Sequence, residues 1–593
     1  MKTELLSGNE AVARGAYEAG VTVASAYPGT PSTEILENIA QYKEIYSEWA
    51  PNEKVSLEMV AGTSIAGARS ICAMKHVGLN VAADPMFTFA YIGTEGGCVI
   101  VTADDPGLHS SQNEQDNRYY ARHAKIPMIE PSDSQEAKDF LIKAYEISEK
   151  FKIPVLFRMT TRVCHSKGMV TLGERKEPSF KKYKRNISAF VSTPANNRIH
   201  HSQLEKKLKE IEEYNNSCSL NKIELNSGEI GIITSGISYQ YSKEVFGNDA
   251  SYLKIGFTFP LPRDTILNFS KKMKKIYVVE ENEPIIENYC RMLGLDVTGK
   301  EKIPVEGELN PDIVEEKLLN IKNEFIKINE EKIVSRPPTL CSGCPHRGIF
   351  YELSKRKNVA ISGDIGCYTL GSTEPLNAMD TIICMGASIS AAHGFSKAFE
   401  KSNQKIKAIG VIGDSTFFHS GITSLLDITY NRGNAAVIIL DNRITAMTGH
   451  QENPGTGYTL KGTETPEVNI ENLVKALGVK NVETINPNNL KQVNEALDRA
   501  IESDEPYVII TKWPCALKKL KEEEKENFKK IPGIFKVNRE KCRKCKMCLK
   551  AGCPSISFDE NIGSIIDEDT CVGCSVCAQI CPFDAIEREG DQL

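Results

Sequence analysis

Cysteine is the residue type whose spacing says most about the chemistry of this chain. Eight of the 18 cysteines lie between Cys542 and Cys581, in two runs that each end in Cys-Pro. The first run has the form CxxCxxCx4CP and the second the form CxxCxxCx3CP. Four thiolates hold an iron–sulfur cube, and in two-cluster modules the fourth cysteine of each run serves the other cube. The pattern therefore predicts two [4Fe–4S] clusters and one-electron chemistry.

This crosswise pattern predicts a ligand set for each cluster. We expect cluster 1 on Cys542, Cys545, Cys548 and Cys581, and cluster 2 on Cys571, Cys574, Cys577 and Cys553. Zinc knuckles are the alternative, because CxxC pairs also suit zinc. The lack of histidine in the runs and the proline after both fourth cysteines favour iron–sulfur clusters. The x4 spacing of the first run is longer than the usual x3 and affects only the expected geometry of its cluster.

A second candidate site lies at the ends of two predicted strands. Gly413-Asp414-Ser415 ends the run IKAIGVIGD, Asp441-Asn442 ends the run NAAVIILDN, and 30 residues separate the two motifs, counted from Gly413 to Asn442. Mg²⁺ takes carboxylate and phosphate oxygens, and ligands of α/β proteins bind at the carboxyl ends of strands. The pattern resembles the thiamine diphosphate signature, GDG followed at this distance by NN. Ser415 and Asp441 are departures from it.

That resemblance assigns ligands to Mg²⁺ and residues to the cofactor. It implies that Asp414, Asn442 and the backbone carbonyl of Ile444 hold the ion, beside Gly413 and Ser415. The alternative is a pair of polar caps at strand ends. Gly386, in MGASISAAHG, could permit close approach of the backbone to the cofactor or could be a helix-packing glycine.

Thiamine also needs a carboxylate that protonates N1′ of its pyrimidine, and this group usually comes from a different domain. Glu58, just before an Ala/Gly-rich helix in VSLEMVAGTSIAGARS, is the candidate. The alternative is a helix-start carboxylate favoured by the helix dipole. Thr30, in AYPGTPSTE, is predicted to cap a helix with Pro31 at its first position. A threonine at a sheet edge can also face a substrate.

The elements that position these residues follow an α/β pattern. Apolar runs typical of buried parallel strands cover 21–27, 98–104, 153–159, 229–236, 275–283, 358–364, 406–414, 434–442 and 506–513. A helix is predicted over 32–46. The Lys/Glu-rich run 517–530 is predicted to be a solvated helix and linker. These elements predict a multidomain α/β fold.

Together, YPGTPSTE (27–34), Glu58, the GDS and DN motifs and the cysteine-rich end resemble the 2-oxoacid:ferredoxin oxidoreductases. RPPTLCSGCPHRG (336–348) and TAMTGHQENPGTG (445–457) strengthen the resemblance, which covers essentially the whole chain. It implies thiamine-diphosphate-binding folds, a transketolase-C-like domain and a two-cluster ferredoxin-type α+β module. The implied limits are a pyrimidine domain at 1–171, a connector at 172–227, the transketolase-C-like domain at 228–330, the diphosphate domain at 331–520 and the ferredoxin module at 532–593.

Four more cysteines gain a meaning from this resemblance. Related enzymes hold a third cube beside thiamine with a CxGC pair, a GIGC cysteine and one late cysteine. Cys341, Cys344, Cys367 and Cys515 match these positions. The resemblance therefore implies a third, proximal [4Fe–4S] cluster, and the alternative is four free core cysteines.

The resemblance also implies a reaction. We expect oxidative decarboxylation of an aryl pyruvate such as indolepyruvate with coenzyme A, giving the aryl-acetyl-CoA, CO₂ and reduced external ferredoxin. Glu58 would activate thiamine and Thr30 would contact the substrate. A separate beta subunit with a gamma-like domain is implied, in a hetero-oligomer with two copies of each chain. Three alternatives stay open: the same chemistry on pyruvate or 2-oxoglutarate, a non-oxidative thiamine-dependent decarboxylase, and a pure electron-transfer subunit.

Composition excludes several other classes of protein. Hydrophobic residues make up 41% of the chain and charged residues 25%, as in globular proteins. The net charge is only −6 over 593 residues, which argues against nucleic-acid binding. No apolar run reaches the length of a membrane span, and the N-terminus lacks a secretory apolar region. We therefore expect a cytoplasmic protein without membrane contact.

Overall fold

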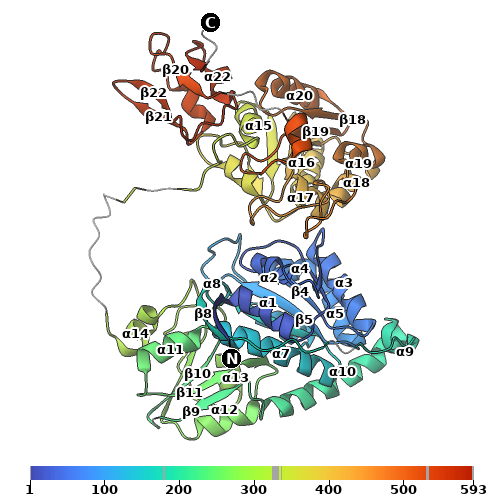
Figure 1. Cartoon of the computed structure of the whole chain (residues 1–593), viewed down its shortest axis with the longest axis vertical. Coiled ribbons are helices and arrows are strands. Elements are labelled where there is room, and N and C mark those ends of the chain that lie inside the picture. The colour runs from blue at the N-terminus through green and yellow to red at the C-terminus, as the bar shows by residue number, and fades with distance from the viewer. Residues whose placement is uncertain are drawn as a thin grey trace. The chain divides into compact units, whose positions relative to one another are not determined.

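The computed structural model describes residues 2–177, 180–226, 228–322, 333–334, 337–528 and 533–589. The chain forms two compact units, Met1–Ile328 and Asn329–Leu593 (Figure 1). The predicted domain limits at residues 227, 330, 331, 532 and 593 lie outside the described residues.

The first unit is built on a seven-stranded sheet. Every neighbouring pair is parallel except β12 with β6. Strands β4, β5 and β7 are buried along their whole length, as expected where both faces of a parallel sheet are covered. The strands predicted within 21–27, 98–104 and 153–159 are confirmed as β2, β5 and β7. In sheet order the strands are β12 (Phe257–Phe259), β6 (Met128–Ile129), β7 (Val155–Thr160), β5 (Cys98–Asp104), β4 (Ser70–Lys75), β2 (Val23–Ala26) and β3 (Tyr46–Trp49).

Helices flank this sheet, in the blue and cyan part of Figure 1. The helix predicted over 32–46 is wrong in its second half. It ends at Ile39, residues 40–45 lie outside helices and strands, and Tyr46, the last residue of the prediction, begins the edge strand β3, whose backbone groups pair with β2. A two-stranded antiparallel pair joins β1 (Thr3–Ser7) to β8 (Lys167–Thr171). The helices are α1 (Gly8–Glu18), α2 (Thr33–Ile39), α3 (Glu53–Ile65), α4 (His76–Val81), α5 (Ala83–Ile92), α6 (Arg118–Ala124), α7 (Ser134–Phe151) and α8 (Thr161–His165).

The rest of the first unit carries a four-stranded sheet in the order β13-β10-β11-β9. The segment predicted as a connector holds α9 (Ile187–Phe190) and the 22-residue α10 (Pro194–Asn215). Strand β12 follows β11 in sequence but joins the first sheet, so one sheet draws strands from both predicted domains. The remaining elements are β9 (Lys222–Glu224), β10 (Ile230–Ser235), α11 (Ser238–Phe246), β11 (Ser251–Ile255), α12 (Arg263–Ser270), β13 (Lys275–Val279), α13 (Ile285–Met292) and α14 (Pro311–Leu319).

The second unit has a six-stranded, all-parallel sheet. Its strands confirm those predicted within 358–364, 406–414, 434–442 and 506–513. In sheet order they are β15 (Thr381–Ile382), β14 (Val359–Gly363), β16 (Lys407–Gly413), β17 (Ala436–Asp441), β19 (Tyr507–Lys512) and β18 (Asn481–Ile485). The helices are α15 (His346–Leu353), the 3-10 helix η2 (Cys367–Ser372), α16 (Ser388–Ser402), α17 (Asp414–Thr416), the π-helical turn η3 (Phe417–Gly421), α18 (Ile422–Tyr430), α19 (Ile470–Ala476), α20 (Leu490–Glu502) and α21 (Glu522–Asn527).

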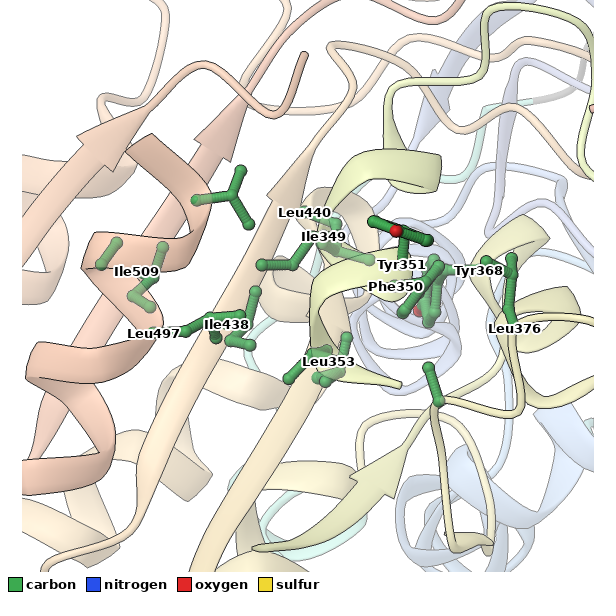
Figure 2. Packing of buried hydrophobic residues seen from close by; sticks show 14 of the residues in the cluster. Ile349, Phe350, Tyr351, Leu353, Tyr368, Leu376, Ile438, Leu440, Leu497 and Ile509 are labelled. Atoms are coloured by element: carbon green, nitrogen blue, oxygen red, sulfur yellow. The ribbon is translucent and has the colours of Figure 1, made fainter. Parts of the chain in front are cut away.

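Both faces of this sheet are buried, as the alternation along β17 shows. Ile438 and Leu440 enter one hydrophobic core and Val437 and Ile439 the core on the opposite face. Figure 2 shows the first core, with Ile349 of α15 beside the strand residues. Such packing fixes the strand ends, where the predicted site residues lie.

The cysteine-rich module consists of two antiparallel strand pairs and two short helices. Ala551, Val576 and Ile580 of this module belong to the same core as the sheet of the second unit. The module is therefore fixed to that sheet. Its elements are β20 (Phe535–Val537), the 3-10 helix η4 (Met547–Ala551), β21 (Ile556–Asp559), β22 (Gly563–Ile566), α22 (Val576–Ile580) and β23 (Ile586–Arg588).

The Lys/Glu-rich run before the module differs from its prediction. Of residues 517–530, only Glu522–Asn527 is helical, and 529–530 lie outside the described residues. Lys518 and Glu524 are not solvated but form an ion pair with side chains only 6% and 10% exposed. Within the described ranges, the chain has no helix long and apolar enough for a membrane span.

Candidate functional site

The strongest candidate site lies at the carboxyl edge of the sheet in the second unit. Three polar residues directly follow the ends of three neighbouring strands: Asp364 follows β14, Asp414 follows β16 and Asn442 follows β17. All three are buried. The chain runs from β14 to β15 in one direction and from β16 to β17 in the other, so β14 and β16 flank the switch point of the sheet. Ligands of open α/β sheets bind at this place.

Asp414 has a buried carboxylate with one unused oxygen. Its Oδ1 accepts from the backbone N–H of Ser415 at 2.7 Å, whereas Oδ2 has no hydrogen-bond partner among the described residues. Burial, followed by the neighbouring carboxylate of Asp441, raises the pKa of Asp414 to about 8. A buried carboxylate oxygen without a hydrogen-bond partner is costly, and a cation beside it would remove that cost. The surroundings of Asp414 therefore fit a Mg²⁺ ligand.

Asn442 is held by its own loop and by a buried histidine. Its Oδ1 accepts from the backbone N–H of Ile444 at 3.2 Å, and its Nδ2 lies 3.4 Å from Nε2 of His346. His346 is 2% exposed, and burial lowers its pKa to about 4, so its ring is neutral at pH 7. The sequence alone gave no role to His346; its position beside Asn442 makes it a support for the site.

The predicted magnesium ligands are of a kind that Mg²⁺ accepts. Asp414, Asn442 and the carbonyl of Ile444 supply one carboxylate and two neutral oxygens. In the described part of the chain, no three His, Cys, Asp or Glu side chains lie close enough together to hold a single metal ion. The predicted magnesium site does not need three of them, because Asp414 is its one carboxylate and the other two ligands are an amide and a backbone carbonyl.

Asp364 is the residue of this edge that sequence reasoning missed. Its carboxylate accepts from the backbone N–H groups of Ile365 and Gly386 and from that of Ser388, at 2.7 to 2.9 Å. It thereby ties the end of β14 to the start of α16. The available signal was the sequence Gly363-Asp364 at a strand end, which repeats Gly413-Asp414.

The two predicted glycines have structural reasons for being glycine. A Cβ on Gly413 would lie 2.4 Å from the ring of Tyr368, and one on Gly386 would lie 2.4 Å from Cβ of Ser420. Gly386 also has a φ of 84°, which side-chain-bearing residues rarely adopt. The packing interpretation of Gly386 thus has direct support. Ser415 is also buried, at 7% exposure.

Gly386→Ala is expected to lower the free energy of unfolding by about 2–4 kcal/mol, from a strained φ and overlap with Ser420. Gly394→Ala is the matched control, because Gly394 lies inside α16 with nothing within 4 Å of its added Cβ. That change should stabilise the chain by about 0.5–1 kcal/mol. Thermal unfolding of the two variants measures both changes in stability. Equal unfolding midpoints would contradict the explanation that Gly386 is required by its φ and by its contact with Ser420.

Electrostatic effects link the four cysteines of the predicted third cluster, although no three of them lie close enough together in the described part of the chain to hold a single metal ion. Burial raises the pKa of Cys344 to about 12, opposed by Arg347 and reinforced by Cys367 and Cys515. Cys341 in turn acts on Cys367 and Cys515. Such mutual effects require short separations. The backbone N–H of Cys515 also donates to the carbonyl of Asn442 at 2.9 Å, so this cysteine adjoins the strand-edge site.

The surroundings of the module's cysteines are compatible with the two predicted sets. Burial raises the pKa of Cys577, with further contributions from Cys574, Cys553 and Cys571 of its own predicted set and a smaller one from Cys548 of the other. The other set surrounds one small cavity in the module, and its members are Cys542, Cys545, Cys548 and Cys581.

A direct contact joins the CSGC loop to the module. A Cβ on Gly343 would lie 1.9 Å from Val572, and the hydroxyls of Ser342 and Ser555 are 2.7 Å apart. Arg347, only 1% exposed, donates to the carbonyl of Ala551 at 2.6 Å and to the carbonyls of Leu340 and Cys341. The loop of the third cysteine set thus lies against the loop that carries Cys571 and Cys574.

The first unit carries the remaining predicted residues, Glu58 and Thr30. Glu58 lies inside α3 rather than before a helix, so it is not the helix-start carboxylate; its side chain is 45% exposed and pairs with Lys54. The predicted cap at Thr30 is wrong. The helix begins at Thr33 with Ser32 as N-cap residue, because a turn closed by Ser32 Oγ donating to the Gly29 carbonyl at 2.9 Å precedes it. The peptide bond Thr30–Pro31 is cis.

Comparison with known proteins agrees with this layout. Residues 14–214 match the family model for the thiamine-diphosphate-binding part of pyruvate flavodoxin/ferredoxin oxidoreductases. Residues 364–511 match the C-terminal binding domain of thiamine pyrophosphate enzymes, and residues 564–587 match a 4Fe–4S binding domain. Thiamine diphosphate and an iron–sulfur cluster are therefore cofactors of this protein.

Full-length relatives define the family more narrowly. Indolepyruvate oxidoreductase subunit IorA of Archaeoglobus fulgidus is 43% identical over 98% of this chain and 97% of its own length. The proteins of that name from Methanothermobacter thermautotrophicus and Thermococcus kodakarensis are 42% and 40% identical, each over 99% of this chain and 97% of their own length. The chain therefore belongs to the family of indolepyruvate oxidoreductase IorA subunits, and it is part of a thiamine-diphosphate-dependent 2-oxoacid:ferredoxin oxidoreductase.

Proposed function

We propose that this enzyme oxidises aryl pyruvates, with indolepyruvate as the preferred substrate. Coenzyme A would take the acyl group, CO₂ would leave, and external ferredoxin would take the two electrons. One observation carries the proposal: the hydrogen bond from Cys515 N–H to the carbonyl of Asn442 connects a predicted cluster ligand to a predicted magnesium ligand. Electrons released at the cofactor would need such an adjoining acceptor. The names of the full-length relatives support the choice of substrate.

The chain's own residues would hold and activate the cofactor. Thiamine diphosphate, when bound, supplies the electron sink for decarboxylation. Asp414, Asn442 and the Ile444 carbonyl would hold Mg²⁺, and Gly413, Ser415 and Gly386 would line the diphosphate. The buried, partnerless Oδ2 of Asp414 supports this assignment. Glu58 would hold a proton at N1′ of the pyrimidine, and Thr30 would contact the substrate.

Three sets of cysteines would hold three [4Fe–4S] clusters. The proximal set is Cys341, Cys344, Cys367 and Cys515, and the module carries clusters 1 and 2. The contact of Gly343 with Val572 supports one-electron transfer between the proximal set and the set of Cys571 and Cys574, because their loops adjoin. Arg347 would keep these loops together through the Ala551 carbonyl.

The third set makes a countable prediction. Anaerobically purified protein should contain about twelve irons per chain, four for each cube. Cys341→Ser should retain about eight, whereas Cys384→Ser, an exposed cysteine outside the predicted sets, should keep all of them. About eight irons in the unaltered protein would remove the proximal cluster.

Partner and location follow the same reasoning. The relatives are named as subunits, and we propose that this chain assembles with a beta subunit carrying the gamma-like domain, two copies of each. The coenzyme A site would then lie outside the residues proposed to hold thiamine diphosphate, Mg²⁺ and the clusters. Cytoplasmic location fits a partner such as ferredoxin.

Product analysis tests the proposal against its alternatives. The assembled enzyme is supplied with ferredoxin, coenzyme A and indolepyruvate, pyruvate or 2-oxoglutarate in turn. We expect indoleacetyl-CoA and reduced ferredoxin, with the highest kcat/KM for indolepyruvate. Higher kcat/KM for another oxoacid would change the substrate. Aldehyde without ferredoxin reduction would establish a non-oxidative decarboxylase.

A further inference from the structure

The sheet of the first unit has a switch point of its own, which no cofactor assignment uses. The chain leaves β2 toward β3 on one side, and then crosses back so that β4 lies on the other side of β2. The crevice outside the carboxyl ends of β2 and β4 is therefore the expected ligand site of this sheet. At this edge, the motif Tyr27–Thr30 follows β2, and Lys75 is the last residue of β4.

Lys75 is a buried ammonium group next to that motif. Its side chain belongs to a residue only 8% exposed, and a Cβ added to Gly29 would lie 3.1 Å from its Cβ. Nζ donates to the backbone carbonyl of Ser110 at 2.6 Å. Burial lowers the pKa of Lys75 to about 8, opposed by Asp105, so the group is mostly charged at pH 7.

In the part of the chain that the structure describes, no carboxylate forms a direct ion pair with Lys75 Nζ, and Asp105 acts on its charge only from beyond ion-pair distance. The nearest candidate, Asp105, is engaged elsewhere: its Oδ2 accepts from Ser110 N–H and Ser111 Oγ, and its Oδ1 accepts from Thr161 Oγ1. An ammonium group buried without a direct ion-pair partner is costly, and two of its N–H donors remain for an anion.

We infer that Lys75 binds the carboxylate of the 2-oxoacid substrate, at the switch point between β2 and β4 and beside Gly29 and Thr30. This inference rests on the proposed function for its ligand class. The compact, strongly hydrated ammonium suits a small anion better than an apolar group. The carbonyl of Ser110 orients Nζ, while Asp105 fixes the loop that carries this carbonyl. A positive charge placed there would select a 2-oxoacid over the corresponding aldehyde or amide.

Binding of unreactive analogues tests the assignment. The assembled, cofactor-loaded enzyme is titrated with indolelactate, which keeps the carboxylate, and with its neutral amide, by calorimetry. Lys75→Met should weaken indolelactate binding by about 10- to 100-fold, the worth of a charge-assisted hydrogen bond, and leave the amide unchanged. KM for indolepyruvate should rise by a similar factor, more than kcat falls. Lys75→Arg should recover part of the loss.

The controls separate this inference from its rivals. Lys43→Met removes an exposed lysine of the same unit and should change nothing. Equal losses for the acid and the amide would mean that Lys75 only supports the loop, and would overturn the inference. So would unchanged acid binding in Lys75→Met, or no acid binding by the unaltered enzyme. If the unaltered enzyme binds indolelactate but oxidises no 2-oxoacid, the proposed function fails. The difference in indolelactate binding between Lys75→Met and the unaltered enzyme would still show whether Lys75 binds the carboxylate.

Discussion

Glu58→Gln is expected to reduce kcat for indolepyruvate oxidation by about 10²- to 10⁴-fold, the usual worth of a positioned acid or base. Glutamine has nearly the same shape but cannot hold or release the proton at N1′ of thiamine. Thiamine diphosphate and all iron should remain bound, because Glu58 is neither a metal nor a diphosphate ligand in this scheme. Stopped reactions with quantified indoleacetyl-CoA measure the loss.

The ion pair of Glu58 with Lys54 supplies the matched control. Lys54→Met removes the partner of Glu58 but not its carboxylate. An exposed pair one helical turn apart contributes little to stability. Turnover of Lys54→Met should therefore stay close to that of the unaltered enzyme, because the carboxylate of Glu58 is kept. Retained turnover in Glu58→Gln would exclude the assigned role.

Asp414→Asn is expected to abolish magnesium-dependent binding of thiamine diphosphate, with turnover reduced by at least about 100-fold because the ligand charge is lost. The same change should make the magnesium-free protein more stable at pH 8. The reason is the buried carboxylate with its unused Oδ2 and its pKa of about 8. Thermal unfolding with and without Mg²⁺ and thiamine diphosphate measures both effects.

The pH dependence follows from this raised pKa. Between the ordinary Asp pKa of 3.8 and about 8, the folded chain without Mg²⁺ keeps the Asp414 proton and the unfolded chain does not. Its stability therefore falls as the pH rises over this range, and levels off above it. Asparagine lacks this contribution. The stability difference between variant and unaltered protein should thus grow from pH 4 to pH 8 in the absence of Mg²⁺.

Addition of the cofactors should reverse the order of stability. Saturation at 100 times the dissociation constant stabilises a folded protein by about 2.7 kcal/mol, a gain that Asp414→Asn should lack. Asp504→Asn, at an exposed aspartate of the same unit, should behave like the unaltered protein under both conditions. Identical responses of Asp414→Asn and the unaltered protein to Mg²⁺ would refute the assigned ligand.

Sequence reasoning succeeded where one local signal determines the structure. The apolar runs ending at Asp104, Asp414 and Asn442 are strands because both faces of their sheets are buried, which a continuous apolar run records directly. The helix predicted over 32–46 is too long because the chain turns after Ile39 to bring Tyr46–Trp49 beside β2, an interaction between segments distant in sequence.

The site residues that were missed depend on contacts that no spacing encodes. Lys75 and Gly29 meet only because β4 lies beside β2. His346 reaches Asn442 across 96 positions of sequence, and Arg347 joins the CSGC loop to Ala551 across 204. Asp364 had a weak signal in its Gly-Asp pair, which became meaningful only when β14 was found beside β16.

The central claim is that electrons from an aryl pyruvate pass through this chain's thiamine site to its clusters. Anaerobic addition of indolepyruvate and coenzyme A to the assembled enzyme, without ferredoxin, tests this claim most directly, with the visible absorbance of the clusters as the readout. We expect rapid bleaching, faster than with pyruvate or 2-oxoglutarate, and none in Glu58→Gln. Absence of bleaching with every oxoacid, in protein that holds thiamine diphosphate and its full iron content, would contradict the account.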